Sequence, residues 1–249
     1  YWQILLAGLF NTLKVALPAL FFSTVLGLFI GVGQLAQHPL LKGLCRGYIH
    51  LFRNVPLLLQ LLAIYFAITQ FLPIASQAWS LGDHVFLSKS GLAFPTFSEA
   101  PVRGRFSIEG GWALSPEYLA VLLALVVYTA AFVAEIVRAG VQAVRPGMRQ
   151  GALALGLNNA QTTRHVVLPL ALRVVVPSLS NQYLNLLKNA SLGVAVGYPE
   201  LVSVANTAIN QSGKAVECVL IILITYALLS AVAAGLMNAL NTRVNRGAL

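Results

Sequence analysis

The sequence predicts an all-α integral membrane protein. Of the 249 residues, 58% are hydrophobic and only 9% are charged, and the mean hydropathy is +0.79. A soluble domain carries about 25% charged residues, so a chain this poor in charge belongs in a bilayer. The apolar residues stand in continuous runs such as 216–240, whereas a membrane β-barrel requires roughly ten-residue segments of alternating hydrophobicity. Helices are therefore the predicted spanning elements.

Five apolar segments are long enough to cross a bilayer, because a helical span needs about 20 residues. The first contains Gly27, Gly31 and Gly33, and small residues let membrane helices approach closely. The second starts near Pro56, which fits the first turn of a helix. The predicted spans, in chain order, are 10–35, 55–74, 117–139, 170–190 and 216–240.

The positive charges predict the orientation of these spans. Cytoplasmic connections of membrane proteins are enriched in Lys and Arg, and alternating connections collect ten of the 16 basic residues. The N-terminus is then outside and the C-terminus cytoplasmic. The charge follows the topology, so the pI of about 9.9 gives no support to nucleic-acid binding. The ten residues are Lys42, Arg46 and Arg53; Arg138, Arg145, Arg149, Arg164 and Arg173; and Arg243 and Arg246.

Two segments fall on the outer side in this topology. Residues 75–116 are rich in Pro, Gly and Ser, and a loop of this length is usually functional or locally folded. The segment is either an inserted region or a landing surface for an external solute-binding protein. The second, 193–217, contains Pro199-Glu-Leu-Val, which indicates a short helix with Glu200 in its first turn.

A short basic segment at 145–168 separates the third and fourth spans. Pro146 fits the first turn of a helix, and Gly156 can end that helix in a left-handed conformation. A second short helix is expected from Asn158 or Asn159 to Leu168, with Pro169 ending it or beginning the next element. This helix pair, with a Leu/Ala face and an Arg rim, is suited to docking on another protein.

The motif Gly147-x-x-Gln-Gly-Ala-x-Ala-Leu-Gly-Leu157, followed by Val166-Val-Leu-Pro169, resembles the EAA coupling loop of ABC-importer permeases. Four further blocks resemble the polar amino-acid uptake branch, and the enlarged 75–116 segment resembles its general L-amino-acid importer subgroup. One departure is clear, since the usual Glu-Ala-Ala reads Gln150-Gly-Ala152. The blocks are Asn11–Lys14, Arg53–Gln60, Ala134–Gly140 and Lys188–Leu192.

The resemblance implies one transmembrane permease domain over 1–249, with the type I ABC importer fold and five spans. Cytoplasmic ABC ATPases would bind and hydrolyse ATP with Mg²⁺, and an external amino-acid-binding protein would deliver substrate. We expect a multi-pass subunit of the bacterial inner membrane that works beside a second permease. The missing acidic residue favours a heterodimer. The residues expected to contact the ATPase are Gly147, Gln150, Gly151, Ala152, Leu155, Gly156 and Leu157.

Polar groups within the predicted spans are the candidates for a substrate path, because such groups are costly in a bilayer and are usually functional. Lys188, Asn189 and Ser191 end the fourth span, where a cation can meet an amino-acid carboxylate. The alternative is a lysine that extends to the outer interface. Gln60, one turn into the second span, faces either the path or a neighbouring helix.

Glu135 and Arg138 are three residues apart and share one helix face. The pattern predicts a structural ion pair that positions the coupling helices, and direct contact of Glu135 with substrate is the alternative.

The sequence shows no catalytic constellation, no metal-binding cluster and no phosphate-binding Gly-Lys-Ser/Thr loop. We therefore expect a translocation subunit that is not an enzyme and binds no cofactor itself. The rival class is a gradient-driven secondary amino-acid carrier, which needs intramembrane carboxylates. Glu135 is the only acidic residue inside the predicted spans, apart from Glu117 and Glu217 at outer ends, so the importer is favoured.

Overall fold

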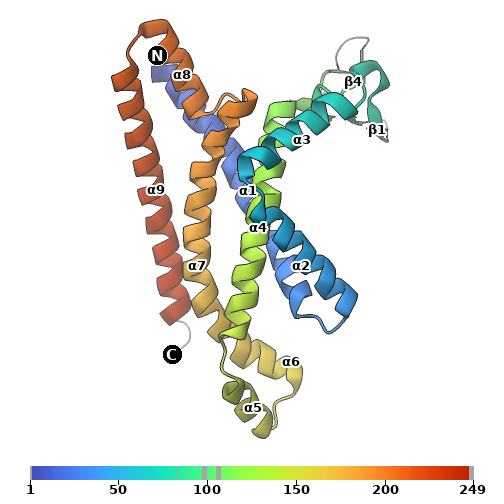
Figure 1. The fold of residues 1–249 in the computed structure, drawn as a ribbon, viewed down its shortest axis with the longest axis vertical. Helices are drawn as coiled ribbons and strands as arrows, with labels where there is room; N and C mark the ends of the chain where they lie inside the picture. Colours follow the sequence, from blue (N-terminus) through green and yellow to red (C-terminus); the bar gives the residue numbers. More distant parts are fainter. Residues whose placement is uncertain (1, 83, 97–99, 105–107, 247–249) are drawn as a thin grey trace. The chain divides into compact units, whose positions relative to one another are not determined.

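The computed structural model describes residues 2–82, 84–96, 100–104 and 108–246, most of which are helical (Figure 1). Three short irregular helices interrupt or extend the chain: η1 (Ala75–Gln77), the π-helical η2 (Thr163–Val167) and η3 (Ala190–Val196). The α-helices are α1 (Trp2–Leu35), α2 (Pro39–Asn54), α3 (Leu57–Phe71), α4 (Pro116–Gln142), α5 (Pro146–Ala154), α6 (Asn159–Thr162), α7 (Leu168–Asn189), α8 (Leu201–Ser212) and α9 (Ala215–Arg246).

Among the described residues, three helices are long and apolar enough to cross a membrane: α1, α4 and α9. Two further segments pass the same test as pairs of helices joined at a short break, α2 with α3 and 159–196 with α8. The total is therefore three, or up to five when each pair counts as one span. The predicted topology of five spans corresponds to the upper number and stays a prediction.

The connection before the second span is a helix, which the sequence analysis did not predict. Residues 39–54 form α2, with Cys45 and Ile49 buried one turn apart. Its basic residues Lys42, Arg46 and Arg53 had suggested a plain cytoplasmic loop. They recur at helical spacing, however, and charges on one face with apolar residues on the other are typical of an amphipathic helix.

The expectation of an all-α chain is wrong in the 75–116 segment, which contains antiparallel sheet. The larger sheet has the order β1-β2-β3-β6, and a separate pair joins β4 to β5. In β2 the buried residues alternate, with Phe86 and Ser88 on one face, which is the period of a half-buried strand. The strands are β1 (Trp79–Leu81), β2 (Val85–Ser88), β3 (Gly91–Phe94), β4 (Val102–Arg103), β5 (Ile108–Glu109) and β6 (Trp112–Leu114).

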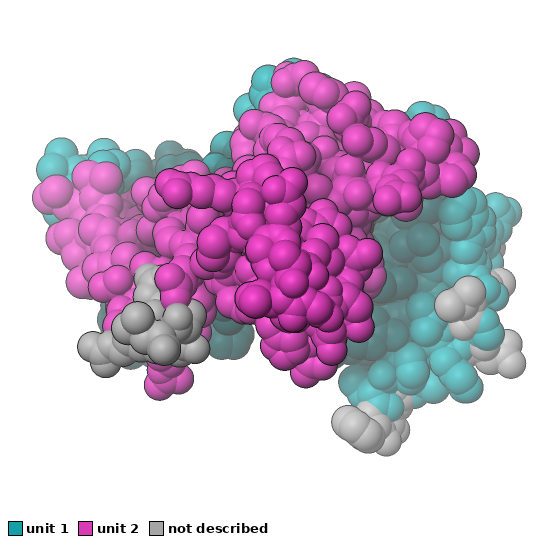
Figure 2. Space-filling model, turned by 90° about the horizontal axis from the view of Figure 1, so that it is seen from below, with its two compact units in different colours: residues 1–19, 55–125, 189–219 teal, residues 20–54, 126–188, 220–249 magenta. Residues whose placement is uncertain are grey.

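The chain divides into two compact units (Figure 2). Unit 1 comprises 1–19, 55–125 and 189–219, and unit 2 comprises 20–54, 126–188 and 220–249. The sequence distributes charge unequally between them. Unit 2 carries eleven of the Lys and Arg residues and a single acidic one, whereas unit 1 carries five basic and six acidic residues.

In unit 1, Asn11 and Thr12 of α1 form hydrogen bonds with the segment that leads into α8. The Asn11 side-chain amide donates to the Pro199 carbonyl (3.0 Å), and the Tyr198 hydroxyl donates to the Asn11 carbonyl (3.0 Å). The backbone N–H of Leu201 donates to the Thr12 hydroxyl (3.2 Å). These bonds give the Asn11–Lys14 block a structural role, because backbone groups at the start of α8, such as the Leu201 N–H, would otherwise be unpaired.

Glu200 caps the start of α8. Its carboxylate accepts from the backbone N–H groups of Val202 (2.9 Å) and Ser203 (2.8 Å), and the side chain is fully buried. The predicted short helix is thus confirmed as α8. Glu200 precedes the first turn as its N-cap, where a negative charge interacts favourably with the helix dipole.

In unit 2, α1 and α4 pack at glycine positions. A Cβ on Gly27 would lie 2.5 Å from the Val133 Cβ, and a Cβ on Gly31 would lie 2.8 Å from the Ala134 carbonyl oxygen. Neither position has room for a larger residue, which is the close approach that small residues permit in membranes. The Thr24 and Tyr183 hydroxyls form a hydrogen bond of 2.7 Å between α1 and α7.

We predict that Gly27→Ala destabilises the protein by about 1–3 kcal/mol, because the added methyl group would force α1 away from Val133. Thermal unfolding of the full chain in detergent measures the effect. Gly43→Ala in α2 is the control, since a Cβ there meets nothing within 4 Å. Equal stability of the two variants would show that the α1–α4 contact is loose.

Candidate functional site

The basic segment forms two short helices, but the second is α-helical only over Asn159–Thr162 and does not run to Leu168 as predicted. Pro146 occupies the first turn of α5, and Gly156 follows the helix with φ +89°, a left-handed conformation that favours glycine. The Asn158 side chain caps α6, and the Gln161 side chain reaches back to complete a capping box. The chain then continues through η2 into α7, so Pro169 lies in the first turn of the next element.

The helix pair is held together by its own contacts within unit 2. Helix α5 contacts α6 and η2, and Ala152 of α5 is buried at 6% exposure. Leu157 is half-buried and its backbone N–H donates to the Ala152 carbonyl (3.2 Å). Ala152 and Leu157 therefore belong largely to the internal packing of the pair.

The remaining candidate contact residues face outward. Leu155 is 83% exposed, and Gly147, Gln150, Gly151 and Gly156 are exposed too. A Cβ placed on Gly147 or Gly151 would meet nothing within 4 Å. A glycine inside a helix costs about 0.5–1 kcal/mol relative to alanine, and no close contact among the described residues offsets that cost at these two positions. An exposed glycine in this setting favours close backbone contact with a partner.

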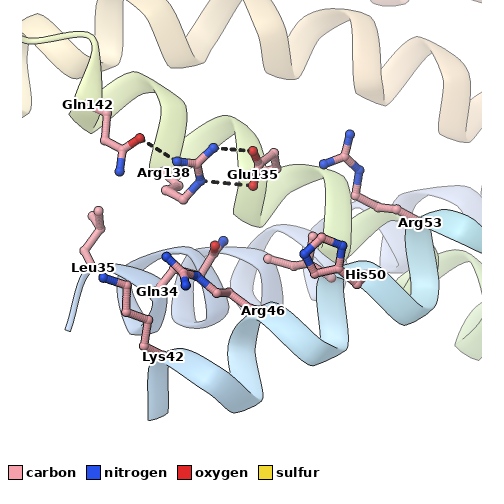
Figure 3. A pocket seen from close by; sticks show the side chains of 10 residues that line it. Gln34, Leu35, Lys42, Arg46, His50, Arg53, Glu135, Arg138 and Gln142 are labelled. Atoms are coloured by element: carbon pink, nitrogen blue, oxygen red, sulfur yellow. Dashed lines mark hydrogen bonds and ion pairs between the residues drawn. The ribbon is translucent and has the colours of Figure 1, made fainter. Parts of the chain in front are cut away.

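A second feature of unit 2 is a pocket of about 460 Å³ between the end of α1, the polar face of α2 and the end of α4 (Figure 3). Figure 3 shows Arg46, His50 and Arg53 on α2 opposite Glu135 and Arg138 on α4. The other residues lining it are Gln34, Leu35, Lys42, Ile49 and Gln142.

Glu135 and Arg138 form an ion pair in this pocket, as their spacing on one helix face allows. Both carboxylate oxygens of Glu135 accept from the guanidinium, with the Arg138 Nε–Oε2 distance at 3.1 Å. The two side chains are 28% and 30% exposed. The contact is a bidentate arginine–carboxylate pair. Its role in positioning the coupling helices stays a prediction.

The other candidate path residues are divided between the units. Gln60 is buried in unit 1, and its amide donates to the Val55 carbonyl (2.8 Å). Its helix α3 contacts η3, where Ser191 lies half-buried. Asn189 ends α7 and is half-buried, whereas Lys188 is exposed in unit 2. Lys188 does not line the pocket that contains Glu135.

Sequence reasoning missed the pocket itself. Lys42 and Arg46 were assigned only to a cytoplasmic connection, Arg53 to that connection and to the Arg53–Gln60 block, and His50 had no role. The signal was present, because residues 42, 46, 50 and 53 repeat at intervals of three or four and so share a helix face. Recognising it required treating the segment as a helix.

Long apolar helices joined by a basic, outward-facing helix pair define a membrane-embedded transport subunit. Residues 23–246 match the family described as the inner membrane component of binding-protein-dependent transport systems, and the chain belongs to that family.

Two relatives named for amino-acid transport agree with this membership. The General L-amino acid transport system permease protein AapQ of Rhizobium johnstonii is 34% identical, over 98% of this chain and 77% of the relative. The Glutamate/aspartate import permease protein GltJ of Escherichia coli K12 is 29% identical, over 90% of this chain and 80% of the relative.

Solved structures share the fold. A crystal structure of an amino acid ABC transporter with histidines has a TM-score of 0.75 and 26% identity, covering 98% of this chain and 95% of that one. An inward-facing MetNI methionine ABC transporter has a TM-score of 0.66 at 20% identity, covering 97% of this chain and 96% of the other. At 20% identity, the likeness to the methionine transporter shows the fold alone. Together they confirm a permease resembling the type I ABC importer fold.

We predict that Gly151→Arg abolishes transport by the assembled importer while the chain still inserts and folds. A Cβ added at Gly151 meets no described atom within 4 Å, so the larger side chain is expected to act mainly on a docked partner. Uptake in reconstituted vesicles and co-purification of the ATPase measure the outcome. Gly151→Ala is the graded control, because alanine is the better helix former and adds only a methyl group. Normal uptake and normal ATPase binding by Gly151→Arg would exclude this face from docking.

Proposed function

We propose that this chain works as the permease subunit of an ATP-driven ABC importer that carries amino acids across the bacterial inner membrane. The observation that carries the proposal is the family match over 23–246, on a fold shared with an amino acid ABC transporter. Relatives named for amino-acid transport over most of this chain support the substrate class. The subunit performs no bond chemistry.

The proposed orientation puts the α5–α6 pair in the cytoplasm and the 75–116 sheet outside. Charge supports it, since unit 2 holds α5 and α6 together with most of the basic residues, and cytoplasmic connections favour Lys and Arg. The 75–116 segment of the sequence contains three basic and three acidic residues, and in the proposed orientation it would face an external amino-acid-binding protein.

The proposed cytoplasmic partner is an ABC ATPase that holds ATP and Mg²⁺ and receives α5 in a surface cleft. Closure of two ATPases around ATP would carry the docked helices and move the spans between inward-open and outward-open states. Gly147, Gln150, Gly151, Leu155 and Gly156 are the contacts that the exposed face offers.

A second permease is the proposed partner within the membrane. Helix α9 exposes a long apolar surface, and none of its most apolar 18-residue window is buried inside the chain. Lipid or another subunit must cover it. A heterodimer is favoured because Gln150 replaces the acidic residue of the family motif, so a second permease with the fuller motif would complement it.

The substrate path is proposed to involve Lys188, Asn189, Ser191 and Gln60. The cation and the amide and hydroxyl groups suit the carboxylate and ammonium groups of an amino acid. Glu135 is a weaker member of this set, since its carboxylate is already engaged by Arg138. The alternative function, a gradient-driven secondary carrier, finds no support in the family match.

We expect amino-acid uptake that requires both ATP and the external binding protein when the complete importer is reconstituted in liposomes. Labelled amino acids, tested as a panel with and without each component, measure this and identify the substrate. Uptake driven by an ion gradient without nucleotide would contradict the proposal. In the same assay Lys188→Met should raise the KM for the amino acid, whereas Glu135→Gln should leave that KM unchanged. The reverse pattern would move the path to Glu135.

A further inference from the structure

The pocket in unit 2 holds an excess of positive charge. Lys42, Arg46, Arg53 and Arg138 line it with one carboxylate, that of Glu135. Like charges gathered in a partly enclosed space repel one another, and the repulsion is larger there than in bulk water. An anion in the pocket would relieve it, so the electrostatics favour a negatively charged occupant.

Two of these cations are already engaged within the chain. Arg138 binds Glu135 through both guanidinium nitrogens that face it, and the Arg53 guanidinium lies 5.1 Å from the centre of the Phe132 ring, a cation–π distance. Within the described ranges, Lys42 and Arg46 form no ion pair. They lie one helical turn apart on α2 and are the cations available to a ligand.

An apolar strip on α1 leads to the same pocket. Val25, Leu28, Phe29 and Val32 are exposed large hydrophobic residues. Leu28 and Phe29 are neighbours, and each lies three or four residues from both Val25 and Val32, so the four share one helix face. Phe29 is 74% exposed and Val32 is 61% exposed. The strip ends at Leu35, which itself lines the pocket.

We propose that the pocket binds the phosphate headgroup of an acidic phospholipid, whose acyl chains lie along the α1 strip. The pocket lies at helix ends, since Leu35 ends α1 and Gln142 ends α4, which is where headgroups meet a membrane helix. Basic pockets between membrane helices on the cytoplasmic side are suited to anionic headgroups. A soluble anion would contact the cations alone, whereas a phospholipid would also place its acyl chains against the adjoining strip.

This site goes beyond the proposed transport function and does not depend on it. It requires only that α1 and α4 span the membrane. Three residues separate Gln142, at the pocket, from Pro146, where α5 begins. An occupied site would therefore brace the end of α4 next to the coupling segment.

Native mass spectrometry of the full chain in detergent tests the proposal. The probes are dioctanoyl-phosphatidylglycerol, dioctanoyl-phosphatidylcholine and glycerol 3-phosphate. The double variant Lys42→Gln/Arg46→Gln should weaken phosphatidylglycerol binding about tenfold or more, because it removes two positive charges that attract the anionic headgroup. The charge-keeping swap Lys42→Arg/Arg46→Lys should retain binding, which separates loss of charge from misfolding.

The matched control is Lys214→Gln/Arg243→Gln, which removes the same charge from two exposed residues outside the pocket. It should leave phosphatidylglycerol binding unchanged. Equal loss in the control would reduce the effect to net charge and overturn the site. Glycerol 3-phosphate binding as tightly as the lipid would assign a soluble anion instead. Phosphatidylcholine binding as tightly as phosphatidylglycerol would remove the role of the cations.

Discussion

The cost of placing charge in a bilayer governs this protein. A charged side chain at the centre of a membrane helix costs roughly 2.5–3.5 kcal/mol on insertion scales, so charged residues collect at the ends of the spans. The separation is visible in the two units, because unit 2 combines eleven basic residues with one acidic residue. That single carboxylate, Glu135, is held by Arg138. The basic ends of unit 2 then supply both the rim of the α5–α6 pair and the walls of the pocket.

Glycine serves two different purposes on this charge-segregated frame. Gly27 and Gly31 allow α1 to approach α4 within unit 2, where any Cβ would collide with neighbouring atoms. Gly147 and Gly151 have open space around them, so internal packing does not explain them. The first kind stabilises the chain itself. The second kind exposes helical backbone, which is what a partner surface needs for close contact.

Much of the fold could be predicted because it rests on strong local signals. Long apolar runs identified α1, α4, α7 and α9, and Pro146 and Gly156 marked the bounds of α5. Segments with short or mixed patterns were not predicted correctly. The helix α2 was missed because its three basic residues were read as marking a cytoplasmic connection, although their spacing was helical.

The rest depends on contacts between distant parts of the chain. The strands of 79–114 are two to four residues long, too short for a reliable alternating pattern. The pocket joins the ends of α1 and α4 to α2, and the bonds from Asn11 and Thr12 to 198–201 connect residues nearly 190 positions apart. No single segment of sequence contains that information. The ion pair of Glu135 and Arg138 could be anticipated because its spacing is local.

Site-specific labelling tests the central claim, that the α5–α6 pair faces the cytoplasm and docks on an ATPase. Ala154→Cys at the exposed end of α5 and Ser90→Cys in the exposed turn after β2 are placed singly in a chain lacking Cys45 and Cys218. A membrane-impermeant maleimide is applied to right-side-out and inside-out vesicles. The account predicts labelling at 154 only in inside-out vesicles, with protection by the bound ATPase, and labelling at 90 only in right-side-out vesicles. Labelling at 154 from the outside, or no protection by the ATPase, would contradict it.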